Sequence, residues 1–405
     1  MAGSATASVS AMRRLLLLVC VLVFVDTMLY AALTPLLPRF ARELGLSKSS
    51  AGALVAAYAA GALVGGLPGG AASVRLGARR AVGAGLAAMG LASVGFALAH
   101  SFWPLFAARF LQGLGSGFTW AGAFAWLLAA APRNRRGALI GTAMGAATFG
   151  ALFGPVVGAA AALAGRAAVF CALAGLAAVL IAWTLRLDPP PPGERPSAAA
   201  VVRALGNRQF VGGLALMALP SLLFGILAVL GPLHLARAGW GAAAIGAVWL
   251  VGAALESLQA PFVGRLTDRR GRLLPVRVSL AGSAIVSVGL ATGARPLLYV
   301  PLVVLAALAY GVLFTPAFAL IADGAEGAGL AQGMAFGVMN AAWALGAIVG
   351  PAAGGAIAGA TGDSIPFALA AGLCASALLF LRSRHERAAV LVDRLAGDPA
   401  RVGRE

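Results

Sequence analysis

Long apolar segments alternate with short polar ones along nearly the whole chain. Each apolar segment has roughly 20 residues, which is enough for a helix to cross a hydrocarbon layer about 30 Å thick. A backbone inside lipid must satisfy its own hydrogen bonds, so it forms either helices or a closed barrel of strands. The ten-residue alternation of a barrel strand is absent, and Ala, Leu and Gly dominate. The pattern therefore predicts an all-α membrane protein.

Twelve transmembrane helices are predicted, in two sets of six. The first set covers residues 15–37, 50–72, 81–99, 103–130, 137–163 and 166–186, and the second covers 210–234, 241–264, 274–293, 296–321, 330–358 and 364–382. The longest polar interruption contains four consecutive prolines, which favours a linker between two halves. We therefore expect an N-terminal bundle over 1–186, a cytoplasmic linker over 187–209, and a C-terminal bundle with a cytoplasmic tail over 210–405.

The composition supports this prediction, because 61% of the residues are hydrophobic and only 11% are charged. So few polar residues cannot cover a soluble core of this size. The net charge of +17 raises the alternative of nucleic-acid binding, but the basic residues gather on every second loop. Twenty-three of them fall on one side of the predicted topology and six on the other. The positive-inside rule then predicts a multi-pass protein of the cell (inner) membrane with both termini cytoplasmic, a lipid bilayer as its surroundings and no nucleic-acid partner.

An internal repeat relates the two halves. At a shift of 194 residues Gly52 falls on Gly246, and at a shift of 196 the pair Gly154-Pro155 falls on Gly350-Pro351. A series of such matches in constant register is not expected by chance, even in a glycine-rich chain. Six helices followed by six in the same orientation predict two parallel, pseudo-symmetric bundles related by an axis along the membrane normal.

The loop between the second and third helices of each half carries a charged pattern. The second half has G-x-x-x-D-R-x-G-R in full, as Gly264, Asp268, Arg269, Gly271 and Arg272. The first half keeps Gly70, Arg75, Gly77 and Arg79 but has Val74 in place of the acid. This pattern resembles the hallmark loop of the major facilitator superfamily. The resemblance implies a carrier that works as a monomer, with these loops holding the cytoplasmic gate shut; a role as topology signals alone is the alternative for the arginines.

Three predicted helices carry further motifs. The fourth has Arg109 inside the apolar segment, followed at helical spacing by Gln112, and this polar face is expected to line a central cavity. An arginine here resembles the pattern of proton-coupled members. The fifth and eleventh helices carry the bends Gly154-Pro155 and Gly350-Pro351, which resemble the glycine-rich signature of the twelve-helix drug:proton antiporters. The alternatives are an arginine at the outer interface and ordinary small-residue packing.

Two acids lie inside predicted helices. Asp26 is at mid-depth of the first helix, four residues before Tyr30, and Glu256 lies in the eighth. Burial disfavours the charged form of a carboxyl group, so such a group can take up and release protons as a cavity opens and closes. We expect protons or a substrate cation to occupy Asp26 and Glu256, with Arg109 shifting the balance. A purely structural role is the alternative for each acid, and Asn340 is a further candidate for the cavity wall.

The predicted function is therefore secondary active transport by alternating access, as proton-coupled export of small amphipathic or cationic compounds. The nearest alternative is a proton symporter that imports a small metabolite such as a sugar or an organic acid. A phosphate-binding loop of the G-x-x-x-x-G-K-[ST] form is absent, which disfavours an ATP-driven pump. The three histidines and three cysteines show no metal-ligand or catalytic spacing, so we predict no metal, no cofactor and no enzymatic activity.

Overall fold

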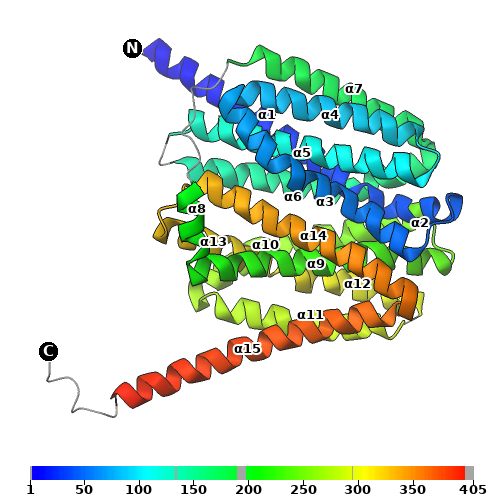
Figure 1. The fold of residues 1–405 in the computed structure, drawn as a ribbon, viewed down its shortest axis with the longest axis vertical. Coiled ribbons are helices and arrows are strands. Elements are labelled where there is room, and N and C mark those ends of the chain that lie inside the picture. The colour runs from blue at the N-terminus through cyan, green and yellow to red at the C-terminus, as the bar shows by residue number, and fades with distance from the viewer. Residues whose placement is uncertain (1, 133–134, 189–197, 294, 397–405) are drawn as a thin grey trace.

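The computed structural model describes residues 2–132, 135–188, 198–293 and 295–396, and its regular structure there is entirely helical (Figure 1). The first half comprises α1 (Ala2–Ala31), α2 (Leu33–Glu43), α3 (Lys48–Arg75), α4 (Ala78–Leu98), α5 (Phe102–Ala130), α6 (Arg136–Ala164) and α7 (Arg166–Arg186). The second comprises α8 (Ala198–Leu205), α9 (Arg208–Arg237), α10 (Ala242–Arg270), α11 (Leu273–Ala291), α12 (Pro296–Gly311), α13 (Phe314–Gly327), α14 (Gln332–Thr361) and α15 (Ser364–Ala396).

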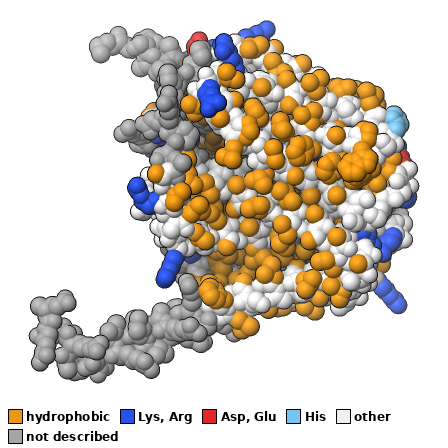
Figure 2. Space-filling view, in the orientation of Figure 1, with side chains coloured by type: hydrophobic (Ala, Val, Ile, Leu, Met, Phe, Trp, Pro, Cys, Tyr) orange, Lys and Arg blue, Asp and Glu red, His pale blue; other side chains and the backbone are white. Residues whose placement is uncertain are grey.

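Eleven stretches of the described chain are long and apolar enough to cross a membrane. In two of them a pair of consecutive helices, α1 with α2 and α12 with α13, together makes one span. The 29-residue α5 packs among these spans and supplies the twelfth, although its buried polar side chains lower its hydropathy. Figure 2 shows a broad hydrophobic surface between two rims where Lys and Arg gather, as expected for a protein that faces lipid.

Two predicted helices prove to be broken. The first span ends one helix at Ala31 and begins another at Leu33, because Pro35 has no N–H to donate to the carbonyl group of Ala31. The tenth span is interrupted between Gly311 and Phe314, ahead of Pro316, for the same reason. Continuous apolar sequence concealed both breaks. The predicted linker also contains one short helix, α8.

The two bundles are built in equivalent ways. In the first, Gly150, Gly154 and Gly158 of α6 face the backbone of the α1–α2 span so closely that a Cβ on any of them would collide with it. In the second, the equivalent Gly346 and Gly350 of α14 face the backbone of α9. Small residues let helix backbones approach closely in a membrane, where apolar burial alone gives little driving force. The predicted pseudo-symmetric architecture is confirmed.

The bundles meet along a seam that obeys the same internal symmetry. Gly246 of α10 faces Pro155 of α6, where an added Cβ would lie 3.0 Å from the proline carbonyl oxygen. Gly52 of α3 faces Pro351 of α14 more closely still. Each contact therefore joins a glycine of one bundle to a proline inside a helix of the other. We call these two contacts the glycine–proline seam.

Close glycine packing within one bundle generates the first prediction. In Gly113→Val the new side chain would collide with the backbone of Tyr58 and Ala62, which cannot move aside as a flexible side chain would. We expect a loss of about 3 kcal/mol or more in stability, since overpacking costs typically 1–3 kcal/mol and here the obstacle is backbone. Gly66→Val is the matched control, because nothing lies within 4 Å of its Cβ position. Thermal unfolding in detergent compares the two, and equal melting temperatures would contradict the packing described.

Candidate functional site: a buried charged cluster in the first bundle

Charged and polar side chains are buried where α1, α3 and α5 meet. Asp26 of α1 is 3% exposed and Arg109 of α5 is 2% exposed, so both are withdrawn from the surroundings of the bundle. Tyr58 of α3, which is 1% exposed, contacts both of them. We call Asp26, Tyr58 and Arg109 the buried cluster. A charge in such surroundings is tolerated only when neighbouring groups compensate it.

Three donors compensate Asp26. The Tyr58 hydroxyl donates to Oδ1 over 2.8 Å, while the Ser116 hydroxyl and the Trp120 indole N–H donate to Oδ2 over 3.0 and 2.7 Å. All three belong to α3 or α5. Because each donates its hydrogen to a carboxylate oxygen, together they stabilise the ionised form of Asp26. The arrangement suits an acid that holds a negative charge or receives a cation.

Backbone oxygens compensate Arg109. Its Nη1 donates to Leu29 O over 2.9 Å and to Gln112 Oε1 over 3.1 Å, and its Nη2 donates to Tyr30 O over 2.6 Å. Leu29 and Tyr30 belong to the last turn of α1, where carbonyl groups lack partners from a following turn and the helix dipole is negative. Arg109 therefore caps the break between α1 and α2, with its side chain in the interior of the protein.

Tyr58 connects the two charges, and among the described residues no ion pair joins them directly. The Arg109 Cζ atom lies 4.7 Å from the centre of the Tyr58 ring, within the range of a cation–π interaction. The tyrosine hydroxyl at the same time donates to Asp26. Arg109 therefore acts on Asp26 across an aromatic ring, and three neutral donors occupy the carboxylate oxygens.

The polar face predicted on the fourth span lies inside the first bundle. Gln112 Nε2 donates to Ser93 of α4 over 3.4 Å, and the Thr119 hydroxyl contacts the sulfur of Met89, also in α4, at 3.8 Å. Gln112 and Thr119 are completely buried. Gln112 thus accepts a hydrogen bond from Arg109 on the side of α4 and does not face the space between the bundles.

Contacts between aromatic rings connect the buried cluster to the second bundle. The Tyr30 ring lies 5.2 Å from that of Tyr58 and 5.3 Å from that of Trp343 in α14. A second path starts at Trp120, which stacks on Phe124 at 5.5 Å. Phe124 is in turn parallel to Phe336 of α14, with ring centres 6.4 Å apart. Movement of α14 relative to the first bundle would therefore reach Asp26 through both paths.

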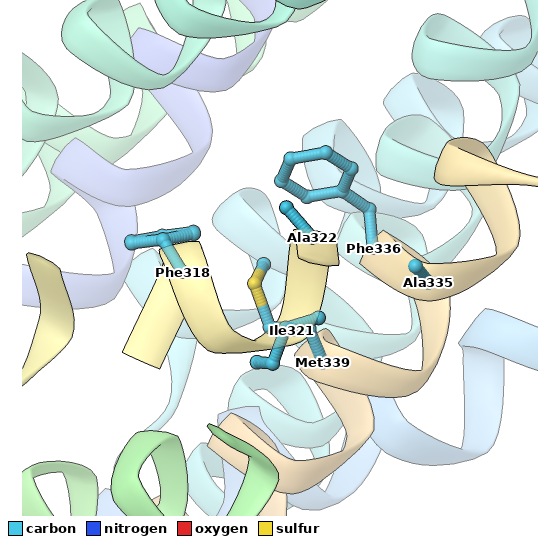
Figure 3. Close-up of a pocket in the computed structure, with 6 residues that line it drawn as sticks. All are labelled: Phe318, Ile321, Ala322, Ala335, Phe336 and Met339. Atoms are coloured by element: carbon cyan, nitrogen blue, oxygen red, sulfur yellow. The ribbon is translucent and has the colours of Figure 1, made fainter. Parts of the chain in front are cut away.

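A small apolar hollow lies beside the second path. Its lining residues come from α13 and α14, three from each helix, as Figure 3 shows: Phe318, Ile321, Ala322, Ala335, Phe336 and Met339. All six side chains are hydrophobic. The hollow is therefore apolar, with room for little more than a water-sized group.

Glu256 lies apart from the buried cluster, in the second bundle. Its carboxyl group contacts the backbone of Gly311, where a Cβ would come within 2.6 Å of Oε1, at the break between α12 and α13. Gln259 donates to Leu308 O over 2.8 Å and Ser279 donates to Ala309 O over 2.5 Å. Polar side chains therefore supply hydrogen bonds to backbone carbonyl groups near this break. Glu256 itself has no hydrogen-bond or ion-pair partner among the described residues. The structure thus does not bring the two predicted acids together.

The charged loop motifs adopt equivalent turns. Gly77 and Gly271 have φ values of +91° and +76°, a conformation that glycine adopts without steric cost. Arg272 forms an ion pair with Asp323 of α13, and Arg79 donates to Leu187 O over 3.3 Å. Arg75 and Arg269 are exposed, and open space surrounds Gly70 and Gly264. The side chain of Asp268 lies outside the described residues.

Asn340 is half-buried in α14, one turn before Trp343, and no hydrogen bond joins it to the buried cluster in the described part of the chain. Tyr58 and Trp120 escaped the sequence analysis because aromatic residues in an apolar helix look like core. Their polar atoms were the available signal, since a tyrosine hydroxyl or an indole N–H inside a membrane requires a partner.

Twelve spans in two parallel bundles, with charged groups buried beside the seam, define the class of polytopic membrane transporters. The family model described as Major Facilitator Superfamily matches residues 19–335, which is most of the chain. The protein belongs to that superfamily and is a membrane transporter of the secondary type.

Solved structures of low sequence identity share the fold. The xylose transporter XylE from E. coli, in a partially occluded inward-open conformation, has a TM-score of 0.71 at 15% identity, over 92% of this chain and 99% of that one. The nucleoside transporter NupG, as a point mutant, gives 0.70 at 16% identity over 91% and 99%. A D-xylose–proton symporter gives 0.73 at 17% identity over 92% and 97%. A comparison with curated protein sequences finds no match.

The capping role of Arg109 generates the second prediction. Arg109→Lys keeps the positive charge but cannot reach Leu29 O, Tyr30 O and Gln112 together, since an ammonium group lacks the planar fork. We expect a loss of about 2–4 kcal/mol in stability, because hydrogen bonds to charged groups contribute about 1.5–3 kcal/mol each. Arg42→Lys, at an exposed position of α2, serves as the control. Thermal unfolding in detergent measures both, and an unchanged Arg109→Lys melting temperature would contradict this role.

Proposed function

We propose that the protein exports small amphipathic or cationic compounds in exchange for protons by alternating access. The observation that carries this proposal is the buried cluster itself. Asp26 presents a carboxylate deep in the protein, Arg109 compensates it only across Tyr58, and Tyr30 extends the cluster to Trp343 of the other bundle. A cation that approaches along the seam finds aromatic faces first and a carboxylate behind them, which is the chemistry that recognises organic cations.

The apolar hollow supports the amphipathic character of the substrate. Phe318, Phe336 and Met339 make the lining of the hollow apolar, and methionine adapts to ligands of different shape. Import of a small metabolite such as a sugar or an organic acid with protons is the second candidate function.

We further propose that the two acids have different roles. Three donors surround Asp26, so its negative charge is stabilised and available to a substrate cation. Among the described residues Glu256 has no donor or cation to offset a charge, and it lies by the C-terminal end of α12, where the helix dipole is negative. Glu256 is therefore our candidate for the proton carrier. The arginine-rich loops support a topology with both termini cytoplasmic in the inner membrane, with bundles over 1–186 and 210–405 and a cytoplasmic linker over 187–209.

The role of Asp26 generates the third prediction. Asp26→Asn should abolish efflux of a cationic dye from proteoliposomes driven by an imposed pH gradient, because the neutral amide cannot pair with a cation. Asp188→Asn, at an exposed site where α7 has ended, is the matched control and should transport normally. Efflux by Asp26→Asn at the control rate would remove Asp26 from the mechanism. Counterflow of labelled sugars and organic acids in the same vesicles tests the import alternative.

The role of Glu256 generates the fourth prediction. Glu256→Gln imitates a permanently protonated acid of the same size, so it should retain exchange of labelled dye for unlabelled dye across the membrane. Net efflux driven by a pH gradient should fall at least about ten-fold, since the proton cannot leave. Both assays use the same proteoliposomes. Full pH-driven efflux by this variant would show that Glu256 does not carry the coupled proton.

A further inference from the structure

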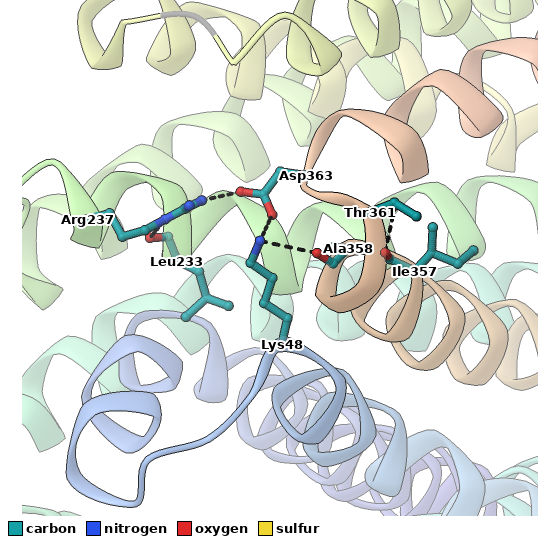
Figure 4. A network of polar contacts seen from close by, with 7 residues as sticks. All are labelled: Lys48, Leu233, Arg237, Ile357, Ala358, Thr361 and Asp363. Atoms are coloured by element: carbon teal, nitrogen blue, oxygen red, sulfur yellow. Dashed lines mark hydrogen bonds and ion pairs between the residues drawn. The ribbon is translucent and has the colours of Figure 1, made fainter.

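A charged triad joins the bundles at one end of the seam. Lys48 opens α3 in the first bundle, Asp363 lies between α14 and α15 in the second, and Arg237 ends α9 in the second. The Lys48 Nζ atom lies 2.6 Å from Asp363 Oδ1, and Arg237 pairs with the other oxygen, Oδ2. Lys48 also donates to Ala358 O over 3.3 Å, at the end of α14 (Figure 4).

Of the ion pairs between described residues, only Lys48–Asp363 crosses from one bundle to the other. Arg39–Glu43 lies within α2, whereas Arg237–Asp363 and Arg272–Asp323 lie within the second bundle. The start of α3 and the end of α14, which carry this pair, lie at the end of the molecule opposite to the one where α1 begins and α15 ends (Figure 1). We call the end that carries Lys48 the latch face.

Local helix energetics do not explain Lys48. It occupies the first turn of α3, where the helix dipole is positive and a cation is disfavoured by about 0.3–1 kcal/mol. It is also the sole lysine in a chain whose other basic residues are arginine or histidine. Its compensation comes from the other bundle, where Ala358 O belongs to the negative end of α14 and Asp363 carries a full charge. The residue is therefore favourable in this position only while the bundles are in contact at the latch face.

One contact of the glycine–proline seam, Gly52 with Pro351, lies one helical turn from this pair. The backbone carbonyl of Lys48 itself contacts Gly355 of α14. Separation of α3 from α14 would break both contacts and the ion pair in a single movement. Arg237 and Asp363 would stay together, because both belong to the second bundle. Opening therefore leaves Asp363 paired and releases Lys48 to water, which keeps the cost of the movement small.

We propose that Lys48 and Asp363 form a releasable latch that holds this face of the carrier closed, with Arg237 retaining Asp363 when the latch opens. The inference rests on the proposed alternating-access transport. It also assigns different roles to the two cations around one carboxylate: Lys48 is the moving contact, and Arg237 is the fixed one.

The latch is not the site at which a transported proton acts. Burial raises the pKa of Asp363, but hydrogen bonds from Lys48 and Arg237 and their positive charges outweigh burial and hold this pKa below its ordinary value. Tyr299 of α12 is the further titratable group close enough to interact with Asp363. A carboxylate with a lowered pKa is fully charged at any pH above the ordinary pKa of an aspartate. It loses its charge only when the pH falls through the lowered pKa. Acidification to about pH 5 therefore leaves the latch intact.

A zero-length cross-link tests the latch directly. A water-soluble carbodiimide activates the Asp363 carboxyl group, the Lys48 amine displaces the urea, and an amide bond forms with net loss of water. Because Lys48 is the sole lysine, the cross-linked peptide is unique in a mass spectrum. We expect this peptide in purified protein and loss of dye exchange in proportion to its yield. Lys48→Arg, which keeps the charge but does not couple, controls for modification of other carboxyl groups.

Solvent access provides a second, independent readout. Ala56 is buried one turn below Gly52 on α3. In a background where Cys20, Cys171 and Cys374 are replaced, Ala56→Cys should react slowly with a water-soluble maleimide. Adding Lys48→Gln should raise the labelling rate about five-fold, the shift expected from losing one partly exposed ion pair, and Lys48→Arg should not.

The outcomes separate the latch from the proposed function. An absent cross-link, or equal labelling rates with Lys48→Gln and Lys48→Arg, would overturn the latch, whatever the protein transports. Cross-linked protein that exchanges dye at the rate of treated Lys48→Arg would overturn it as well. Cross-linking and faster labelling together with no transport of any cationic dye would leave the latch standing and contradict the proposed substrate class.

Discussion

A helix that breaks inside a membrane leaves carbonyl groups that water does not reach, and the first bundle depends on how this break is satisfied. Arg109 supplies the missing donors to Leu29 and Tyr30 at the end of α1. A buried guanidinium group then requires its own compensation, which comes from Gln112, the Tyr58 ring and, across that ring, Asp26. One proline-induced break thus accounts for the presence of two opposite charges deep in the protein.

The contact between the bundles is also built from a few close backbone approaches. Each bundle contributes one glycine, Gly52 or Gly246, that contacts a proline inside a helix of the other, Pro351 or Pro155. Backbones in such close contact have little freedom to slide, so the bundles are expected to separate or rejoin as units. The second bundle carries its own broken span, with Glu256 beside it in place of a charged pair. Pseudo-symmetric scaffolds therefore hold chemically different centres, which suits a carrier in which substrate and proton bind at different places.

The architecture could be predicted from the sequence because lipid imposes simple rules on the chain. The apolar segments, the proline-rich interruption and the repeat pairs Gly52/Gly246 and Pro155/Pro351 predicted twelve spans in two related bundles, and the fold confirms them. The breaks near Ala32 and after Gly311 were missed because proline lies within continuous apolar sequence there, and hydropathy does not record a lost backbone donor.

The candidate site was predictable only in part. Asp26 and Arg109 stood out because charged residues are rare at this depth. Tyr58 and Trp120 did not, since aromatic side chains in an apolar helix are ordinary core. Lys48 and Asp363 occupy unrelated loops of different bundles, and a pairing over that separation follows from tertiary structure and not from local pattern. The same limit applies to Glu256 and Gly311, whose contact depends on how α10 packs against α12.

If a substrate cation at Asp26 and a proton at Glu256 exclude one another, binding of the cation releases a proton into solution. Purified carrier in weakly buffered detergent solution receives a permanent organic cation such as tetraphenylphosphonium, and a pH-sensitive dye records the change. The account predicts release of up to about one proton per carrier, absent in Asp26→Asn and in Glu256→Gln. Saturating binding of the cation with no proton released at any pH between about 5 and 8 would contradict it.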